Sequence, residues 1–202
     1  MKAAIVDYGM GNVGSVGNAL HFLGVKYSVT ADPADIRTAT HILLPGVGAF
    51  DEGMRQLTSR GLPEVLRAEV ASGKPFLGIC LGMQLLASRG EEGAGSEGLG
   101  LIEGVVRRFS IDERRYPVPH VGWNDVLPKQ GARLFEGIKQ PVFYFVHSYH
   151  LVPASEVATA AIGDYGESFV AAVEVGSLFG VQFHPEKSQN SGLQLLKKFL
   201  SI

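Results

Sequence analysis

The stretch P-F-L-G-I-C-L-G-M-Q, Pro75–Gln84, contains the only cysteine of the chain, Cys80. Residues 76–79 form a short apolar run with the length and composition of a buried strand. From Leu81 onward the residues are good helix formers, and we expect this helix to continue through Ala87. The sequence therefore predicts a strand that turns into a helix at Cys80.

The residues on each side of Cys80 indicate a nucleophile. Gly78 and Gly82 produce the pattern G-x-C-x-G, which is the layout of the G-x-S-x-G nucleophile elbow with sulfur in place of oxygen. Glycine permits the sharp turn and the close approach of neighbouring segments, and the first N–H groups of a following helix favour the thiolate. A lone cysteine is more often a small buried apolar residue, so this interpretation needs a base elsewhere in the chain.

Composition narrows the class of protein. The chain has 202 residues, of which 46% are hydrophobic and 19% charged, and these values fit a single domain over residues 1–202. A net charge of −2 gives no indication of the excess positive charge with which proteins bind nucleic acid or an anionic membrane. One cysteine excludes an internal disulfide framework and multi-cysteine zinc sites, and we expect no cofactor and no metal. With no signal peptide or membrane span in the sequence, we expect a cytoplasmic protein.

The order of the predicted elements indicates an α/β fold. Strand and helix patterns alternate in the first half, and strands dominate the second half before a final amphipathic helix at 191–200. We therefore expect a mostly parallel central sheet flanked by helices, with an antiparallel extension in the C-terminal half. A surface loop is expected at 89–100. The predicted strands are residues 3–6, 26–30, 42–44, 76–79, 105–109, 142–146, 157–162, 169–175 and 178–183.

Two glycine-rich segments follow predicted strands. Asp7–Asn12, D-Y-G-M-G-N, matches neither the phosphate-binding nor the dinucleotide-binding motif, so it is either a plain turn or a functional surface loop. Pro45–Gly48, P-G-V-G, is either a simple turn or the source of a backbone N–H donor for a developing oxyanion.

A candidate base follows a strand in the second half. His184 ends the predicted strand and stands in H-P-E with Pro185 and Glu186. Ligands gather beyond the carboxyl ends of parallel strands, so His184 is expected close to Cys80. Pro185 stiffens the link between imidazole and carboxylate. Glu186 could then bind one ring nitrogen while the other takes the thiol proton, as in a catalytic triad.

Several motifs resemble one known family over nearly the whole chain. G-I-C-L-G-M-Q at 78–84 and V-Q-F-H-P-E-K at 181–187 resemble the class I (triad) glutamine amidotransferases. The finer resemblance is to the glutaminase subunits of imidazole glycerol phosphate synthase, of histidine biosynthesis. It rests on D-Y-G-M-G-N at 7–12, L-P-G-V-G-A-F at 44–50, P-H-V-G-W-N at 119–124 and Y-F-V-H-S-Y at 144–149.

This resemblance implies a reaction and a partner. Glutamine would be hydrolysed to glutamate, and the ammonia would pass to a separate cyclase subunit, in a heterodimer that forms imidazole glycerol phosphate and AICAR. No nucleic acid or membrane partner is implied. The alternatives are the glutaminase subunit of another class I amidotransferase, a thiol hydrolase acting alone, and a catalytically silent binding subunit.

The resemblance also implies roles for individual residues. Cys80, His184 and Glu186 would form the triad, and the backbone N–H of Leu81 would be the first oxyanion donor. A second oxyanion donor would come from Gly46 or Val47.

The substrate's charged groups and the partner need further residues. Glu92 suits the α-ammonium of glutamine, and strand-end residues could present backbone donors to its α-carboxylate. The substrate-binding candidates are Gly48, Gln84, Glu92, His147, Ser148 and Tyr149. The candidates for the partner interface are Asn12, Trp123 and Lys187. Trp123, the only tryptophan, is either a core aromatic or an anchor at the partner surface.

Overall fold

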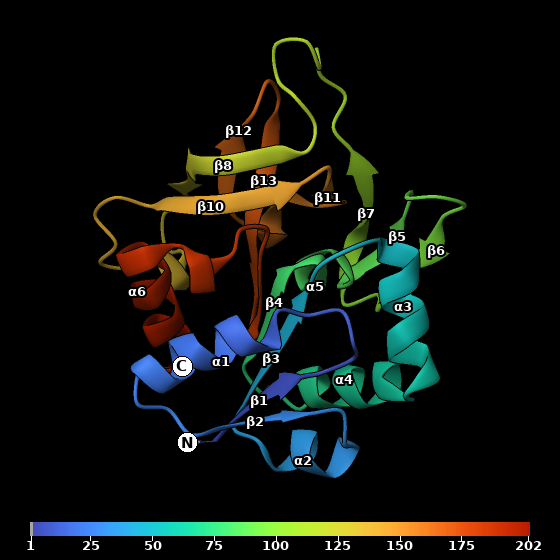
Figure 1. The fold of residues 1–202 in the computed structure, drawn as a ribbon, viewed down its shortest axis with the longest axis vertical. Coiled ribbons are helices and arrows are strands. Elements are labelled where there is room, and N and C mark those ends of the chain that lie inside the picture. The colour runs from blue at the N-terminus through green and yellow to red at the C-terminus, as the bar shows by residue number, and fades with distance from the viewer. Residues whose placement is uncertain (1) are drawn as a thin grey trace.

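The main sheet of the protein has eight strands, in the order β2-β1-β3-β4-β14-β13-β12-β9. A computed structural model describes residues 2–202 (Figure 1). The first five strands of that order run parallel, and the last three continue the sheet antiparallel, so the predicted fold class is confirmed. The strands are β1 Ala3–Val6, β2 Tyr27–Thr30, β3 His41–Gly46, β4 Phe76–Cys80, β14 Leu178–Val181, β13 Ser168–Val175, β12 Thr159–Asp164 and β9 Leu127–Pro128.

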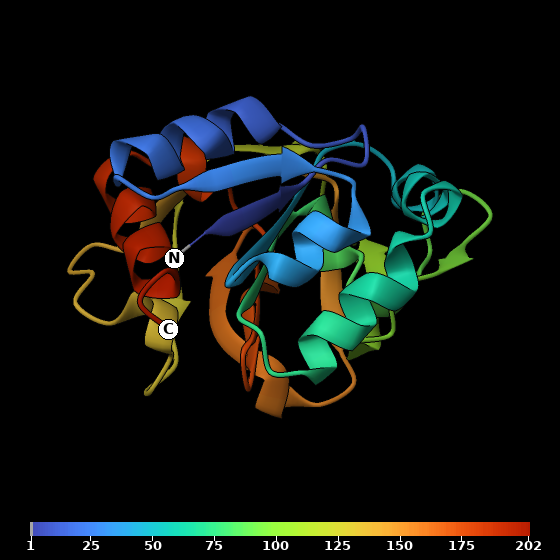
Figure 2. The ribbon, with the colours of Figure 1, turned by 90° about the horizontal axis from the view of Figure 1, so that it is seen from below.

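Helices cover both faces of this sheet (Figure 2). Strand residues alternate between the faces: Leu43 of β3 packs in the core under α1 and α6, whereas Ile42 and Leu44 pack in the core under α2, α3 and α4. The helices are α1 Val13–Phe22, α6 Gln189–Phe199, α2 Pro33–Thr38, α3 Phe50–Ser59 and α4 Leu62–Ala71. Within residues 2–202, no helix is long and apolar enough to cross a membrane.

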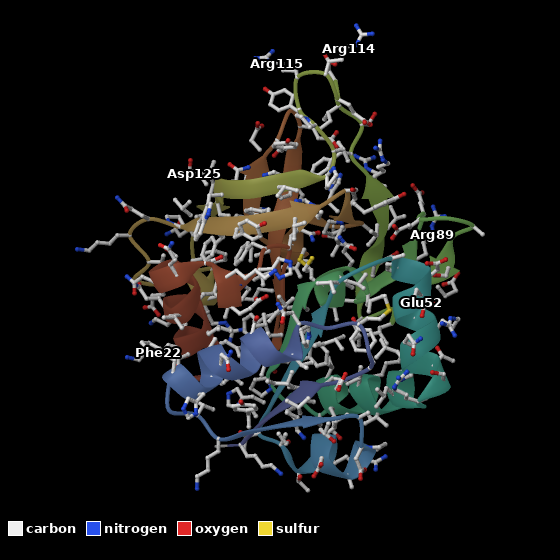
Figure 3. The ribbon with its side chains drawn as sticks, viewed as in Figure 1. Phe22, Glu52, Arg89, Arg114, Arg115 and Asp125 are labelled. Atoms are coloured by element: carbon white, nitrogen blue, oxygen red, sulfur yellow. The ribbon has the colours of Figure 1, made fainter. Side chains whose placement is uncertain are left out.

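Two small sheets extend the molecule beyond the parallel strands. One pairs β8 with β10, and the other has the order β11-β7-β5-β6. In Figure 1, β8 and β10 lie across the upper part of the molecule, above β4 and the short helix α5 (Leu81–Gln84) that follows it. The connection between β7 and β8 carries Arg114 and Arg115 at its tip, far from the helices (Figure 3). These strands are β8 His120–Asp125, β10 Val142–His147, β11 Tyr149–Pro153, β7 Ile102–Arg108, β5 Ala87–Gly90 and β6 Ser96–Glu97.

The helix after Cys80 is shorter than predicted. α5 covers only Leu81–Gln84, and Ala87, which we expected in the helix, begins β5. The cause is pairing with a distant segment: the N–H groups of Leu99 and Gly100 donate to the carbonyls of Leu85 and Ala87 at 2.8 and 2.9 Å. These bonds take the carbonyls that a longer helix would use, so tertiary pairing overrides helix propensity.

The expected surface loop at 89–100 is wrong in part. It includes the end of β5 and all of β6, and Gly98 and Leu99 are buried. A Cβ atom at Gly98 would lie 2.2 Å from the Ala87 carbonyl oxygen, so glycine lets this segment pack directly on the backbone of β5.

Other boundaries also differ from the prediction. Pro45 and Gly46 belong to β3 and not to the following turn, because β3 pairs with β4 as far as the pair Gly46–Cys80. The strands β8 and β11 were not predicted. The predicted strands at 3–6, 26–30 and 169–175 agree with β1, β2 and β13 to within one residue.

Candidate active site

Cys80 occupies a strained turn at the end of β4. Its φ of 54° and ψ of −113° are rare for a residue with a side chain. The neighbouring glycines allow the turn to pack: a Cβ atom at Gly82 would lie 1.7 Å from the Leu44 carbonyl oxygen, and one at Gly78 would lie 2.6 Å from the Gly82 carbonyl oxygen. The predicted strand-to-helix turn at Cys80 is confirmed, and its packing presents the sulfur at the end of the strand.

His184 and Glu186 follow the neighbouring strand β14. β4 and β14 are parallel, with Ile79 opposite Val181, so their carboxyl ends bring Cys80 and His184 together. The His184 Nδ1 atom lies 2.8 Å from Glu186 Oε1, and both side chains are buried. The predicted imidazole–carboxylate pair is therefore present, with the ring held between its carboxylate and the sulfur.

The environment of His184 favours a charged imidazole. Burial is the largest influence and lowers its pKa, but interactions with Cys80 and then Glu186 outweigh burial and raise the pKa to about 9. Nε2 has no partner of normal hydrogen-bond geometry within residues 2–202, so its contact with Cys80 is loose. Such contacts often tighten only when substrate binds. The raised pKa therefore favours transfer of the thiol proton to Nε2, which leaves a thiolate beside an imidazolium.

Two further groups contact the sulfur. The Cys80 Sγ atom lies 3.9 Å from the carbonyl oxygen of Val146 and 3.8 Å from Nε2 of Gln182. Gln182 was not among the predicted site residues. Its signal in the sequence is a polar residue between Val181 and Phe183 in an otherwise apolar strand.

A cavity of about 330 Å³ opens beside the sulfur. All six predicted substrate-binding residues line it together with Cys80 and Leu81. Gln84 uses its Nε2 to donate to the carbonyl of Tyr149 at 2.8 Å, and Glu92 accepts the Phe50 N–H on Oε2 at 2.8 Å. The remaining lining residues are Val47, Gly48, Pro119, Val146, His147, Ser148 and Tyr149.

The two predicted sources of oxyanion donors differ in this conformation. Leu81 lines the cavity directly after Cys80, as the elbow requires. Val47 also lines the cavity, but its N–H donates to the carbonyl of Met10 at 2.6 Å. Gly46 is the last residue of β3 and is not among the lining residues. In this conformation, therefore, Val47 does not offer a free donor to the cavity.

A neutral histidine pair joins His147 of the cavity wall to His120, which is not among the lining residues. His147 Nδ1 lies 2.9 Å from the Tyr149 carbonyl, which can only accept, so Nδ1 carries the proton and Nε2 accepts from His120 Nδ1 at 3.1 Å. Burial lowers the pKa of His120 to about 4, and burial is also the largest of the influences that lower the pKa of His147 to about 3. Both rings are therefore neutral near pH 7.

Two of the three predicted interface residues form one exposed group. Trp123 on β8 is 48% exposed, so it is not a core aromatic. Its ring lies 6.1 Å from that of Tyr144, its partner across the β8–β10 pair, and Lys187 Nζ lies 5.8 Å from the Tyr144 ring. The side chain of Asn12, the third predicted interface residue, caps α1 by accepting the Ser15 N–H at 3.4 Å.

Comparisons with known proteins agree with this geometry. The chain is 49% identical over 198 residues to the imidazole glycerol phosphate synthase subunit HisH of Moorella thermoacetica, covering 97% of this chain and 92% of that one. It is 44% identical to the subunit of the same name from Methanothermobacter thermautotrophicus, covering 98% of both chains. These similarities extend over almost all of each chain.

Solved structures share the fold at lower identity. A glutamine amidotransferase matches with a TM-score of 0.76 at 20% identity, covering 98% of this chain and 97% of the other. PurLQS from Thermotoga maritima matches with a TM-score of 0.76 at 21% identity, covering 99% and 97%. The model of the family "Glutamine amidotransferase class-I" matches residues 4–202. The chain therefore belongs to the class-I glutamine amidotransferase family.

Proposed function

We propose that this protein is the glutaminase subunit of an imidazole glycerol phosphate synthase, acting in histidine biosynthesis. The observation that carries the proposal is the meeting of Cys80 with the His184–Glu186 pair beside a cavity lined by all six predicted substrate residues. Relatives that are 44–49% identical over nearly the whole chain are named imidazole glycerol phosphate synthase subunit HisH, which supports the proposal. Residues 1–202 would form one glutamine amidotransferase domain, working in the cytoplasm, where reducing conditions suit a free thiol.

The reaction begins at Cys80. The thiol proton passes to Nε2 of His184, and the thiolate attacks the side-chain amide carbon of glutamine. The tetrahedral intermediate collapses to a glutamyl thioester when the His184 imidazolium protonates the departing ammonia. His184 then activates a water molecule that hydrolyses the thioester to glutamate, and Glu186 keeps the ring oriented through each step.

The oxyanion of both intermediates needs donors. The N–H of Leu81 supplies one, and the segment at Gly46 and Val47 supplies the other. Since the Val47 N–H is bonded to the Met10 carbonyl, that segment must rearrange before the second donor can act. Loss of one oxyanion donor costs about 2.7–4 kcal/mol of transition-state stabilisation. The uncomplexed subunit should therefore be nearly idle.

The cavity matches the functional groups of free glutamine. Glu92 faces the α-ammonium with the carboxylate oxygen that the Phe50 N–H leaves free. Ser148 and Tyr149 supply backbone donors to the α-carboxylate, and His147 holds this segment through the Tyr149 carbonyl. Gly48 and Gln84 line the remaining wall.

The partner is the cyclase subunit, with which the chain forms a heterodimer. Trp123 and Lys187 present an exposed aromatic and a cation on the same side of the β8–β10 pair, and Asn12 adds a polar contact at the start of α1. Ammonia released at Cys80 passes to this subunit for the synthesis of imidazole glycerol phosphate and AICAR. The chemistry needs no cofactor.

The test is the release of glutamate from glutamine, with and without the cyclase subunit and its nucleotide ligand. We expect strong stimulation by the partner in the wild type and none in Cys80→Ala. High activity in the subunit alone would contradict the idle state. Hydrolysis of peptides or esters without any partner would favour a thiol hydrolase, and stimulation by another synthase would favour a different amidotransferase.

A further inference from the structure

A fully buried glutamine contacts the sulfur and has no part in the mechanism above. Gln182 has no exposed surface, its Nε2 lies 3.8 Å from Cys80 Sγ, and its Oε1 accepts from Gln84 Nε2 at 3.1 Å. We propose that Gln182 is a fourth catalytic residue, an N–H donor that positions the Cys80 sulfur and stabilises its thiolate. This inference rests on the proposed function only in taking Cys80 as the nucleophile.

The orientation of the Gln182 amide follows from its partners. The carbonyl of Tyr149 can only accept, so the end of Gln84 that lies 2.8 Å from it must be the NH₂ group. The same NH₂ group faces Gln182, whose nearer atom must therefore be the accepting Oε1. This leaves the NH₂ group of Gln182 directed at the sulfur.

The far end of this chain of bonds is also fixed. The Tyr149 carbonyl accepts a second bond, from Nδ1 of His147 at 2.9 Å, and His147 is held in turn by His120. Two donors from different elements thus hold the one carbonyl that orients Gln84 and Gln182. A rigid hydrogen-bonded path connects the sulfur to the segment that lines the substrate cavity.

The Val146 carbonyl and the Gln182 amide favour different protonation states of the Cys80 sulfur. The Val146 carbonyl, 3.9 Å away, can accept the S–H of the thiol but offers nothing to a thiolate. Gln182 donates, so it stabilises the anion that forms when the S–H bond breaks and the proton binds Nε2 of His184. No other atom is exchanged and nothing is oxidised in this step.

Local geometry explains why a glutamine occupies this position. Val181, the last residue of β14, and Phe183 both pack in the core under α1 and α6, so Gln182 between them points to the opposite side. A buried amide requires hydrogen-bond partners. A purely structural role would satisfy the amide equally well, so the test must report on the thiolate.

The test is the rate of Cys80 alkylation by iodoacetamide as a function of pH, in the isolated subunit. The chain has one cysteine, so mass spectrometry reports on this thiol alone. The variants are Gln182→Met, which removes the donor at similar length, and Gln182→Glu, which adds a negative charge. Gln130→Glu, at an exposed position, is the matched control for that charge.

We expect the midpoint of the alkylation profile to move up by roughly 1–2 pH units in Gln182→Met, the scale of a hydrogen bond to a charged group. In Gln182→Glu it should move further, and in Gln130→Glu it should stay at the wild-type value. An unchanged midpoint in a folded Gln182→Met would overturn the proposal. Folding is checked by near-ultraviolet circular dichroism.

A measurement on the wild type remains decisive if the variants do not fold. The side-chain amide protons of Gln182, followed by NMR, should shift with the same pH midpoint as the alkylation of Cys80. Their failure to titrate would refute the contact. Neither experiment uses glutamine or the partner, so either can fail while the glutaminase assay succeeds, and the reverse also holds.

Discussion

The charge on Glu186 should set both the rate of the reaction and its limit at alkaline pH. Glu186→Gln keeps the size of the side chain and an acceptor for Nδ1 of His184, which lies 2.8 Å away, but removes the negative charge. The Glu186 side chain is only 1% exposed, so water cannot replace that charge.

The size of the effect follows from the pKa of His184. Its rise from 6.5 to about 9 corresponds to about 3 kcal/mol in favour of the imidazolium. Interactions with Cys80 and with Glu186 produce this rise against burial. Glu186→Gln removes the contribution of Glu186 to this stabilisation of the imidazolium. We expect the activation free energy to rise by between about 1 and 3 kcal/mol, which is a decrease in kcat of about 5- to 150-fold. KM should change little, because Glu186 does not line the cavity.

The assay is steady-state release of glutamate by the complex with the cyclase subunit, measured as a function of pH. Because the raised pKa keeps the His184 imidazolium protonated up to about pH 9, activity should be lost as the pH rises through that value. In Glu186→Gln this alkaline limb should move to lower pH. The matched control is Glu97→Gln, which removes the same charge from an exposed strand. An unchanged kcat with an unmoved alkaline limb would refute the triad geometry.

Three further perturbations test the fold and the surface. Gly82→Ala should lower the free energy of unfolding by about 3 kcal/mol or more in urea denaturation, because its Cβ would meet the Leu44 carbonyl at 1.7 Å. The control is Gly14→Ala, at a position with open space, and equal stability of the two variants would contradict this expectation. The unfolding free energy should also fall as the pH drops from 6.5 toward 4. In this range His120 and His147, with pKa values of about 4 and 3 in the folded chain, bind protons only when the chain is unfolded. An unfolding free energy that does not change over this pH range would contradict the neutral burial of the two rings. Trp123→Ala should weaken binding of the cyclase subunit by about 2 kcal/mol or more in calorimetry, and an unchanged affinity would remove Trp123 from the interface.

The meeting of the nucleophile and its base could be predicted because local signals place each of them at the carboxyl end of a strand. The glycines around Cys80 mark a sharp turn, and H-P-E follows the end of an apolar strand. Parallel strands bring their carboxyl ends to one edge of the sheet. Once β4 and β14 pair in parallel, Cys80 and His184 must lie close together.

The extent of the helix after Cys80 could not be predicted, because it depends on a distant segment. Leu85 and Ala87 have high helix propensity, but their carbonyls bind the N–H groups of Leu99 and Gly100. Strand β8 escaped prediction for a similar reason: its polar residues and Gly122 resemble a loop until β10 pairs with it.

The finer features of the site also arise from contacts between distant residues. The pattern P-G-V-G suggests a backbone donor, yet only the fold places the Met10 carbonyl on the Val47 N–H. The amide of Gln182 reaches Cys80 across 102 positions of sequence. A polar residue in an apolar strand indicates a buried polar contact, but the sequence does not indicate which residue it contacts.

The central claim is that Cys80 is acylated by glutamine, and the most direct test is to trap that intermediate. The complex with the cyclase subunit would be quenched in acid during turnover, digested, and analysed by mass spectrometry. We predict a glutamyl adduct on the peptide that contains Cys80, and its absence in Cys80→Ser. Glutamate release without any adduct on this peptide, or with an adduct elsewhere, would contradict the claim.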